Sequence, residues 1–317
     1  MGINRKPAII SIAGYKLTKE EIKLLKIEKP WGVILFKRNI LSFEQAKKLT
    51  KQIRQCLNDQ FYPILIDEEG GKVSRLSNLF NTREFSQNFF GNIYENNKKK
   101  GILIYKYYLE TISNILNDMG VNINTIPVMD LLQNSTHEII KGRSYSKKLS
   151  TVKSLGKFCI SFLKEKKIAT VAKHAPGHGC ANADSHKKLP VVKKKPKELY
   201  AADFSAFNNL NCHFLMTAHV LYKKIDPSFS ATHSKNIIEK IIRKKLNFKG
   251  LIISDDISMK ALSKNLILNA KNALNSGCNL VLHCSGKIQE SRNLLNNLEV
   301  IDKFTQKKTY QFYEFLR

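Results

Sequence analysis

Short apolar runs alternate with longer amphipathic stretches along the chain. The runs are rich in β-branched residues and almost free of polar ones, which is typical of parallel strands that are buried on both faces. Eight such runs occur, at residues 8–13, 32–36, 62–66, 121–126, 168–172, 213–216, 250–253 and 279–282. Because strands and helices alternate eight times, we predict an α/β fold, a single (β/α)8 TIM-type barrel that spans residues 1–317 as one catalytic domain.

The stretches between the runs carry the signals of helix ends. Residues 18–21 and 42–45 both have a hydroxyl side chain followed three positions later by Glu or Gln, the pattern of a capping box at a helix start. A further helix is expected over residues 102–119, with Gly120 at its end. The remaining helices are predicted at residues 150–166, 197–209, 234–246, 258–276 and 288–298, with a last one after Thr305.

Composition narrows the class of protein. Hydrophobic residues make up 43% of the chain, enough for a large core, and no apolar run approaches the roughly 18 residues that a membrane span needs. The six cysteines include no C-x-x-C pair, so we interpret them as reduced thiols of a cytoplasmic protein. The net charge of +27 comes mostly from lysines scattered along the chain, which indicates a solvated surface. We therefore expect neither a membrane nor a nucleic acid as a partner, and the oligomeric state stays open.

Ionisable residues and glycines follow almost every apolar run. In a barrel of this kind the catalytic groups lie on the loops that follow the strands, at one mouth of the barrel. The clusters occupy residues 37–39, 67–75, 127–130, 173–178, 217–219, 254–256 and 283–286. The sequence therefore predicts one site where these clusters converge. Trp31 precedes the second run, at the opposite end of the barrel, and is expected to pack there.

Asp255 stands at the end of the seventh run, next to Asp256. A carboxylate that is held by rigid backbone at a strand end can act as a nucleophile on a sugar carbon. The alternative is that one of the two aspartates, or Ser258, caps the following helix. Both interpretations can hold together, and the residues alone do not decide between Asp255 and Asp256 for the chemistry.

Three histidines and an aspartate lie on the segment 173–190. They are His174, His178 and His186, with Asp184 two residues before His186. A carboxylate can orient an imidazole and favour its protonated form, so an Asp-x-His pair could serve as an acid near neutral pH. The rival interpretation is a metal site, although the spacing fits neither H-E-x-x-H nor a structural zinc pattern.

Charged residues in other segments of the chain could bind a polar ligand. Asp67 and Arg75 flank a Gly-Gly turn, and their charges suit hydrogen bonds to sugar hydroxyls, or equally a salt bridge to each other. Arg143 lies in a polar stretch after the fourth run, where the alternative is an ordinary surface arginine.

Taken together, these segments resemble the bacterial β-N-acetylhexosaminidases of glycoside hydrolase family 3, of the NagZ type. The resemblance extends from about Gly32 to Gly286, and its pieces occur in the order of the family. They read GVILFKRN, IDEEGGKVSRL, PVMDL, GRSYS, KHAPGHG, DSH, LP, MTAHV, ISDDISMKAL and GCNLVL. The combination of KH-PGHG, DSH and SDD-x-SM is highly specific.

The resemblance implies roles for individual residues and an activity. It implies Asp255 as the nucleophile that forms a covalent glycosyl-enzyme, and His186 as general acid and then base with Asp184 as its partner. It also implies that N-acetylglucosamine is held by five residues: Asp67, Arg75, Arg143, Lys173 and His174. The implied reaction needs no metal and no other cofactor. The implied substrate is N-acetylglucosamine joined to 1,6-anhydro-N-acetylmuramic acid, with or without peptide, in cytoplasmic cell-wall recycling.

The chain departs from the family pattern at four positions. Glu68 replaces the usual Gln, Lys72 the usual Arg and Ala175 the usual Phe, and Cys180 lies inside the loop after the fifth run. Ala175 could loosen the sugar pocket or alter closure of that loop.

Three rival functions follow from the same residues. They are a phosphorylase that uses phosphate as acceptor, a nucleic-acid-binding protein driven by charge, and a metal-dependent hydrolase on the same barrel.

Overall fold

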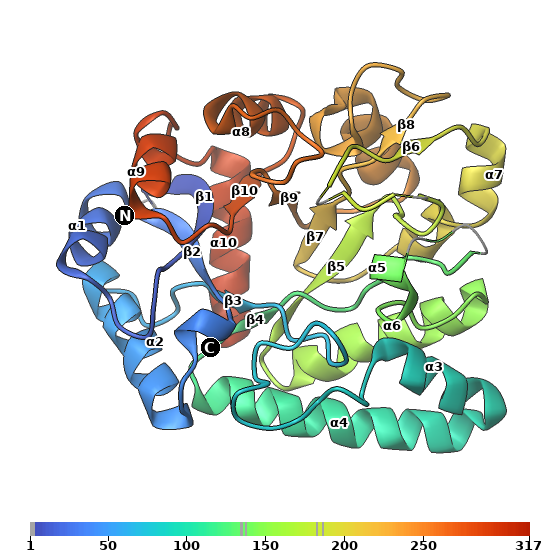
Figure 1. Ribbon diagram of the computed structural model, residues 1–317, viewed down its shortest axis with the longest axis horizontal. Helices are drawn as coiled ribbons and strands as arrows, with labels where there is room; N and C mark the ends of the chain where they lie inside the picture. The colour runs from blue at the N-terminus through green and yellow to red at the C-terminus, as the bar shows by residue number, and fades with distance from the viewer. Residues whose placement is uncertain (1–3, 134–135, 137, 182, 186) are drawn as a thin grey trace.

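A closed barrel of eight parallel strands forms the centre of the computed structural model, which describes residues 4–133, 136, 138–181, 183–185 and 187–317 (Figure 1). Neighbouring strands follow the chain order, and the first strand pairs with the last. The barrel strands are β1 (Lys6–Ser11), β2 (Pro30–Leu35), β3 (Ile64–Ile66), β4 (Ile123–Asn124), β5 (Ala169–Ala175), β7 (Phe214–Thr217), β9 (Leu251–Asp256) and β10 (Leu280–His283). The predicted (β/α)8 fold is therefore confirmed, and each predicted run overlaps one strand.

Side chains alternate between the inside and the outside of the barrel along each strand, as the two-residue period of a strand requires. Leu251 and Ile253 of β9 belong to the inner cluster, whereas Ile252 between them packs in the outer layer against the helices. The same alternation in β10 places Leu280 and Leu282 inside. These two apolar layers explain why the strands read as continuous apolar runs.

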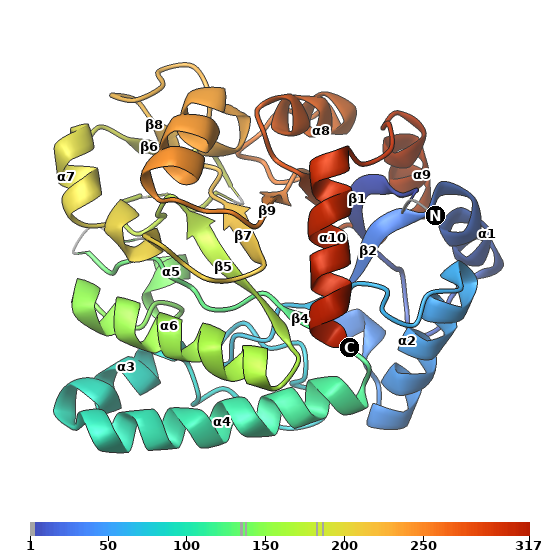
Figure 2. The ribbon, with the colours of Figure 1, turned by 180° about the vertical axis from the view of Figure 1, so that it is seen from behind.

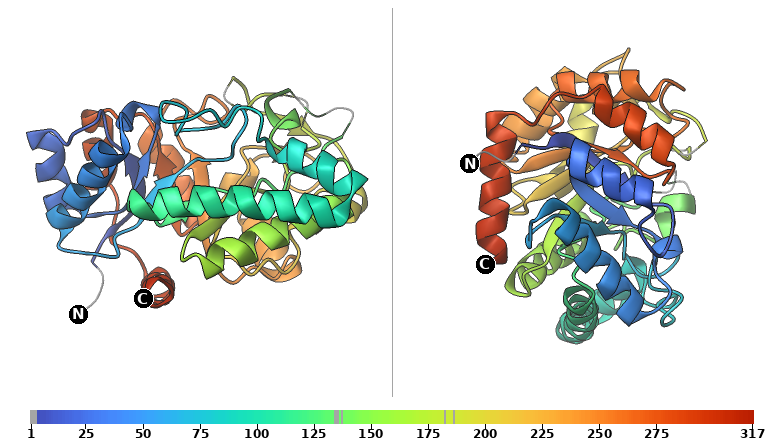
Figure 3. Two further views of the ribbon diagram at one scale, coloured as in Figure 1. Left: turned by 90° about the horizontal axis from the view of Figure 1, so that it is seen from below. Right: turned by 90° about the vertical axis from the view of Figure 1, so that its left-hand side faces the viewer.

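Helices surround the barrel and cover its outer layer (Figures 1 and 2). The longest, α4, lies along α6, with α3 beside it (Figure 3). The α-helices are α1 (Lys19–Glu28), α2 (Phe43–Leu57), α3 (Gln87–Asn96), α4 (Lys98–Asp118), α5 (Glu138–Lys141), α6 (Leu149–Glu165), α7 (Pro196–Ala201), α8 (Leu266–Asn275), α9 (Ile288–Asn296) and α10 (Lys303–Leu316). Three short 3₁₀ helices are η1 (Lys37–Asn39), η2 (Phe204–Phe207) and η3 (Ala231–His233), and η4 (Asn236–Lys245) is a ten-residue π-helix. Outside the barrel, β6 (Val191–Val192) pairs with β8 (Leu221–Tyr222).

Local sequence signals set several helix ends as predicted. Thr18 caps α1: its side chain accepts a hydrogen bond from the Glu21 amide, and the Glu21 carboxylate accepts one from the Thr18 amide. The second box is only half formed, because the Gln45 side chain accepts from the amide of Leu41 rather than that of Ser42. Gly120 follows α4 with a φ of 75°, a left-handed conformation that glycine adopts without strain.

Two predicted helices differ from the structure. The helix expected over residues 258–276 begins only at Leu266, and the prediction that Asp256 or Ser258 caps it is wrong because Asn265 is the cap. The Asn269 side chain donates to the carbonyls of Ile257 and Ser263, so the preceding segment is held by side-chain bonds instead of helical ones. The helix expected over residues 197–209 breaks at Ala202 into α7 and η2.

The C-terminal helix α10 closes the end of the barrel that lies opposite the strand tips (Figure 2). Trp31 is fully buried there: its indole Nε1 donates to Thr309, and its ring packs against Phe214 and Phe312. The expectation that Trp31 packs at the closed end is confirmed. Across the described part of the chain, no helix is both long enough and apolar enough to span a membrane.

Candidate active site

A cavity of about 340 Å³ opens among the loops that follow the barrel strands. This volume falls at the lower end of the range for small-ligand pockets, about 300–1,000 Å³. The residues that line it are Phe36, Asp67, Glu69, Val73, Arg75, Ile140, Arg143, Lys173, His174, His178, Ser185, Met216, Asp255, Asp256, Met259, Leu282 and Cys284. Six of the eight residues predicted for the site therefore meet in one place.

The loop after β3 carries much of this lining, and its shape depends on the Gly-Gly turn. Gly70 and Gly71 both have left-handed backbone, with φ of 77° and 62°. A Cβ atom on Gly70 would lie 2.1 Å from the carbonyl oxygen of Phe85, so only glycine fits. The turn returns the chain past the barrel mouth and brings Arg75 back to Asp67.

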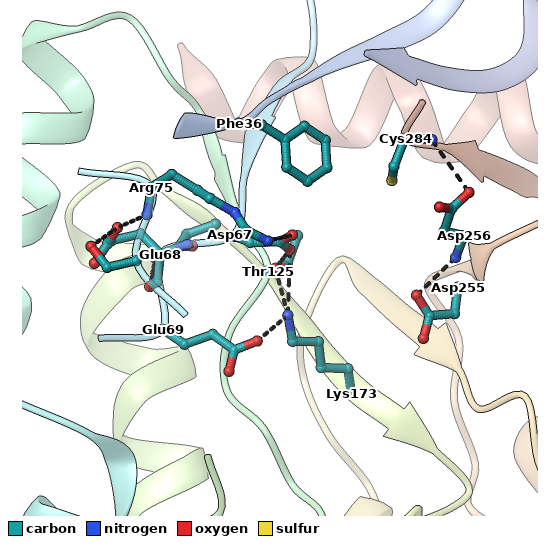
Figure 4. A network of polar contacts seen from close by, with 12 residues as sticks. Phe36, Asp67, Glu68, Glu69, Arg75, Thr125, Lys173, Asp255, Asp256 and Cys284 are labelled. Carbon is teal, nitrogen blue, oxygen red and sulfur yellow. Dashed lines mark hydrogen bonds and ion pairs between the residues drawn. The ribbon is translucent and has the colours of Figure 1, made fainter. Parts of the chain in front are cut away.

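The Asp67 carboxylate lies beside two cationic side chains, those of Arg75 and Lys173 (Figure 4). Its Oδ2 accepts from the Arg75 guanidinium at 2.9 Å, and its Oδ1 accepts from the Thr125 hydroxyl and, at 3.4 Å, from Lys173. Burial opposes ionisation of this carboxyl, but the nearby charges of Lys173 and Arg75 hold its pKa well below the ordinary value. The Asp67–Arg75 salt bridge that we considered as an alternative is present, inside the cavity wall.

Glu69 joins two of the predicted binding residues, although the sequence did not single it out. Its side chain is 1% exposed, and it accepts from Lys173 Nζ at 2.6 Å and from Arg143 Nε and Nη2 at 2.8 and 2.9 Å. Burial alone would raise its pKa, but the two cations lower it to about 2. The Arg143 side chain is only 13% exposed, so this residue belongs to the site and is not an ordinary surface arginine.

Asp130, after β4, holds the segment that follows β5. Its carboxylate lies 2.7 Å from His174 Nδ1 and accepts from the amides of His174 and His178. His174 Nε2 faces an Arg143 nitrogen at 3.3 Å. Since an ionised carboxylate can only accept a hydrogen bond, His174 Nδ1 is the donor to Asp130. Asp130 could have been predicted as a residue of the site from its position after a barrel strand.

The two neighbouring aspartates after β9 differ in what their carboxylates contact. Asp256 accepts from the amide and hydroxyl of Ser258 and from the amide of Cys284, so it stabilises the turn. Asp255 accepts from the Asp256 amide through Oδ1, and its Oδ2 has no hydrogen bond to the rest of the described chain. Although burial opposes ionisation, the nearby imidazoles of His174 and His219 and the hydrogen bond from the Asp256 amide keep the pKa of Asp255 below its ordinary value, so the carboxyl is ionised. The geometry therefore favours Asp255 as the reactive carboxylate.

His219 fixes the backbone at this point. Its Nε2 lies 3.0 Å from the Asp256 carbonyl, which can only accept, so this nitrogen carries the proton. Its Nδ1 lies 2.7 Å from the Thr232 hydroxyl. Both ring nitrogens are thus occupied in a fully buried imidazole, whose pKa burial lowers. His219 stabilises the strand end that presents Asp255.

The loop after β5 carries the predicted Asp-x-His pair. Asp184 is buried and does not line the cavity itself, but its neighbour Ser185 does. The Ser185 carbonyl accepts from the amide of Ala261, which ties this loop to the one after β9. His186 lies outside the described residues, so its distance from Asp255 stays a prediction. In the described part of the chain, no three His, Cys, Asp or Glu side chains are placed to hold a metal ion.

The departures at Ala175, Cys180 and Lys72 lie away from the cavity. Ala175 is fully buried in the outer apolar layer, so it does not border the sugar pocket as we expected it could. Cys180 belongs to the same layer, and burial raises the pKa of its thiol. Lys72 is exposed on the loop after β3.

Glu68 is the departure that changes the electrostatics of the site. It is fully buried, and its Oε2 accepts from the Ser74 hydroxyl and from the amides of Arg75 and Leu76. Burial raises its pKa to about 7, because the hydrogen bonds offset only part of the cost of removing the charge from water. The carboxyl bonds the same backbone amides that a glutamine oxygen could.

Replacing Glu68 with glutamine is expected to stabilise the protein at high pH. The pKa of Glu68 is about 7 in the folded chain against an ordinary 4.5. Ionisation of Glu68 therefore lowers the free energy of unfolding of wild type as pH rises from 4.5 to 7, and this contribution is constant above pH 7. Glu68→Gln lacks this loss. Its free energy of unfolding, measured in urea, should gain about 3 kcal/mol relative to wild type between pH 4.5 and pH 8. An equal difference at the two pH values would contradict this interpretation.

Comparisons with known proteins agree with the geometry. The profile of the glycosyl hydrolase family 3 N terminal domain matches residues 4–310. A β-hexosaminidase of Psychromonas ingrahamii is 32% identical over 302 residues, which cover 93% of this chain and 87% of the relative. A solved structure of NagZ from Neisseria gonorrhoeae, in complex with N-trifluoroacetyl-D-glucosamine, aligns with a TM-score of 0.89 at 28% identity and covers 98% of this chain and 90% of that one.

A third relative is longer than this chain. The structure of a family 3 β-N-acetylglucosaminidase from a Paenibacillus species aligns with a TM-score of 0.86 at 25% identity, over 98% of this chain and 60% of that one. The resemblance inferred from the motifs is thereby confirmed over nearly the whole sequence. The chain belongs to glycosyl hydrolase family 3 and is a glycoside hydrolase.

Proposed function

We propose that the protein is a retaining exo-β-N-acetylglucosaminidase that removes terminal N-acetylglucosamine from peptidoglycan fragments. The observation that carries the proposal is the ionised Asp255, which has one carboxylate oxygen without a hydrogen bond to any described residue, in a cavity that Asp67, Arg75, Arg143, Lys173 and His174 also line. A cavity of this size suits one sugar ring, and its donors and acceptors suit hydroxyl and amide groups. The related NagZ structure with N-trifluoroacetyl-D-glucosamine supports the same sugar class.

The first step of the proposed reaction transfers the sugar to the protein. An Asp255 oxygen attacks the anomeric carbon as the bond from that carbon to the aglycone oxygen breaks. His186, oriented by Asp184, gives its proton to the departing oxygen. The product of this step is a glycosyl ester of Asp255 and a free aglycone.

The second step releases the sugar. Water attacks the anomeric carbon from the side that the aglycone left, and His186 takes one of its protons. The bond to Asp255 breaks, and its carboxylate is restored. Two inversions at the same carbon give net retention of the β configuration.

We place the substrate among fragments in which N-acetylglucosamine is joined to 1,6-anhydro-N-acetylmuramic acid, with or without peptide, in cytoplasmic cell-wall recycling. Their carboxylates would be attracted to a surface with a net charge of +27. We also propose that residues 1–317 work as one catalytic domain, since β1 and β10, near opposite ends of the sequence, pair to close the barrel.

Turnover of an aryl N-acetyl-β-glucosaminide tests the proposal. We expect wild type to release the aryl alcohol and β-N-acetylglucosamine, seen by NMR before mutarotation, at a rate independent of phosphate and of a chelator. His186→Ala should lose about 10²- to 10⁴-fold in the hydrolysis of an unactivated glycoside, as expected for a general acid. A sugar phosphate product would indicate a phosphorylase. Loss of activity on addition of a chelator would indicate a metal-dependent hydrolase. An inert wild type would overturn the proposal.

A further inference from the structure

Thr125 occupies a central position in the charged network, yet it does not line the cavity. It follows β4, is fully buried, and lies between Asp67 and Lys173 (Figure 4). Its hydroxyl donates to Asp67 Oδ1, and its oxygen accepts from Lys173 Nζ at 2.8 Å. These directions are fixed, because a carboxylate can only accept and an ammonium can only donate.

The hydroxyl decides how Lys173 uses its three N–H groups. One donates to Glu69 at 2.6 Å and one to Thr125 at 2.8 Å, while the third reaches Asp67 only at 3.4 Å. The third N–H is thus the weakest bonded and the one most readily directed to a ligand. Without Thr125, Lys173 could turn fully to Asp67, and the two charges would satisfy each other.

The backbone of the strand ends is held by a different residue. The Asn124 side chain accepts from the Glu68 amide at 3.0 Å and donates to the Glu68 carbonyl at 2.9 Å. This pair of bonds fixes the end of β3 against the end of β4 without any contribution from the Thr125 hydroxyl. Removing that hydroxyl should therefore change side-chain orientation and leave the backbone in place.

We propose that Thr125 is a positioning residue of the sugar site, which keeps the Asp67 carboxylate and the Lys173 ammonium apart and aimed at the substrate. The inference rests on the proposed function, because it assumes that Asp67 and Lys173 bind the sugar. Thr125 acts through these two residues and touches no ligand itself, since it is absent from the described lining of the cavity.

Kinetics of four variants on the aryl N-acetyl-β-glucosaminide test this role. Thr125→Val keeps the shape and removes the hydroxyl, and we expect it to raise KM by about 10- to 100-fold, the worth of a hydrogen bond to a charged group, with a much smaller change in kcat. Thr125→Ser keeps a hydroxyl and should restore KM. In the Asp67→Asn background, Thr125→Val should have little further effect, because its partner is already altered.

Thr50→Val is the matched control. Thr50 is also buried, and its hydroxyl donates to the Met119 carbonyl at 2.7 Å, away from the cavity. This variant should lower the melting temperature without changing KM. The inference is overturned if Thr125→Val behaves like Thr50→Val, if Thr125→Ser fails to restore KM, or if the effects of Thr125→Val and Asp67→Asn simply add. An inert wild type would instead overturn the proposed function, and this inference with it.

Discussion

The Asp255→Ala variant is expected to lose turnover of the aryl N-acetyl-β-glucosaminide by about 10⁴-fold or more in kcat, the scale seen when a nucleophile is removed. Asp255 is ionised, and one of its carboxylate oxygens has no hydrogen bond within the described residues, whereas the Asp256 carboxylate is hydrogen-bonded to Ser258 and Cys284. Replacing Asp255 with alanine removes the oxygen that we propose as the nucleophile and leaves the binding groups on the other strands in place. The measurement is kcat under saturating substrate, with circular dichroism to verify that the variant is folded.

Asp256→Asn separates the two aspartates. This variant keeps Asp255, so its kcat should fall only because the turn after β9 is less well held. The loss in kcat should be much smaller than in Asp255→Ala. Adding azide to Asp255→Ala should restore turnover and yield the α-glycosyl azide, because the small anion enters the space of the missing carboxylate. If Asp255→Ala keeps its rate while Asp256→Asn is inactive, the assignment of the nucleophile is wrong.

The Glu69→Gln variant is expected to lose both stability and activity. Glutamine offers one neutral oxygen where Arg143 and Lys173 now share two charged ones, so these two largely buried cations lose the anion that they share. Breaking a buried ion pair in this way costs about 3–5 kcal/mol of the free energy of unfolding. We expect kcat/KM to fall by about 10²-fold or more, because misplacement of binding groups by an ångström has effects of that size. Urea denaturation and steady-state kinetics at pH 7 measure the two losses.

The stability difference should also depend on pH. The pKa of Glu69 is lowered to about 2 from an ordinary 4.5, so its stabilising charge is fully present above pH 4.5 and is lost as pH falls toward 2. The difference in free energy of unfolding between wild type and Glu69→Gln should therefore become smaller as pH falls from 4.5 toward 2. The control is Glu239→Gln, which removes an exposed ion pair with Lys235 and should change stability by less than about 1 kcal/mol. A Glu69→Gln variant as stable and active as that control would refute the role of Glu69.

The fold could be predicted because its signals are local. Each barrel strand is a short, continuous apolar run in the sequence, and the chain order of such strands determines which loops lie at the same mouth of the barrel. The capping box at Thr18 is likewise contained within four residues. Helix α3 was missed, and the segment before α8 was wrongly read as helical, because there the Asn269 side chain replaces the helical hydrogen bonds.

The candidate site was predictable only in part, for a related reason. Asp67, Lys173 and Asp255 could be named from their positions at strand ends and from family motifs. Glu69 and Thr125 owe their importance to partners 48 or more residues away, and no local pattern distinguishes a carboxylate or hydroxyl that is buried between two charges. The geometry that favours Asp255 over Asp256 likewise depends on Cys284, which belongs to another strand end.

The pairing of β1 with β10 has a consequence for how the chain is made. Ala8 lies beside Val281, so the partner of the first strand is the last barrel strand to leave the ribosome. Until then, every incomplete barrel has two open strand edges, one of them on β1, that can pair with other chains. The ring cannot close strand by strand during synthesis. Its closure waits until β10 has been synthesised, and until then both strand edges stay open to pairing with other chains.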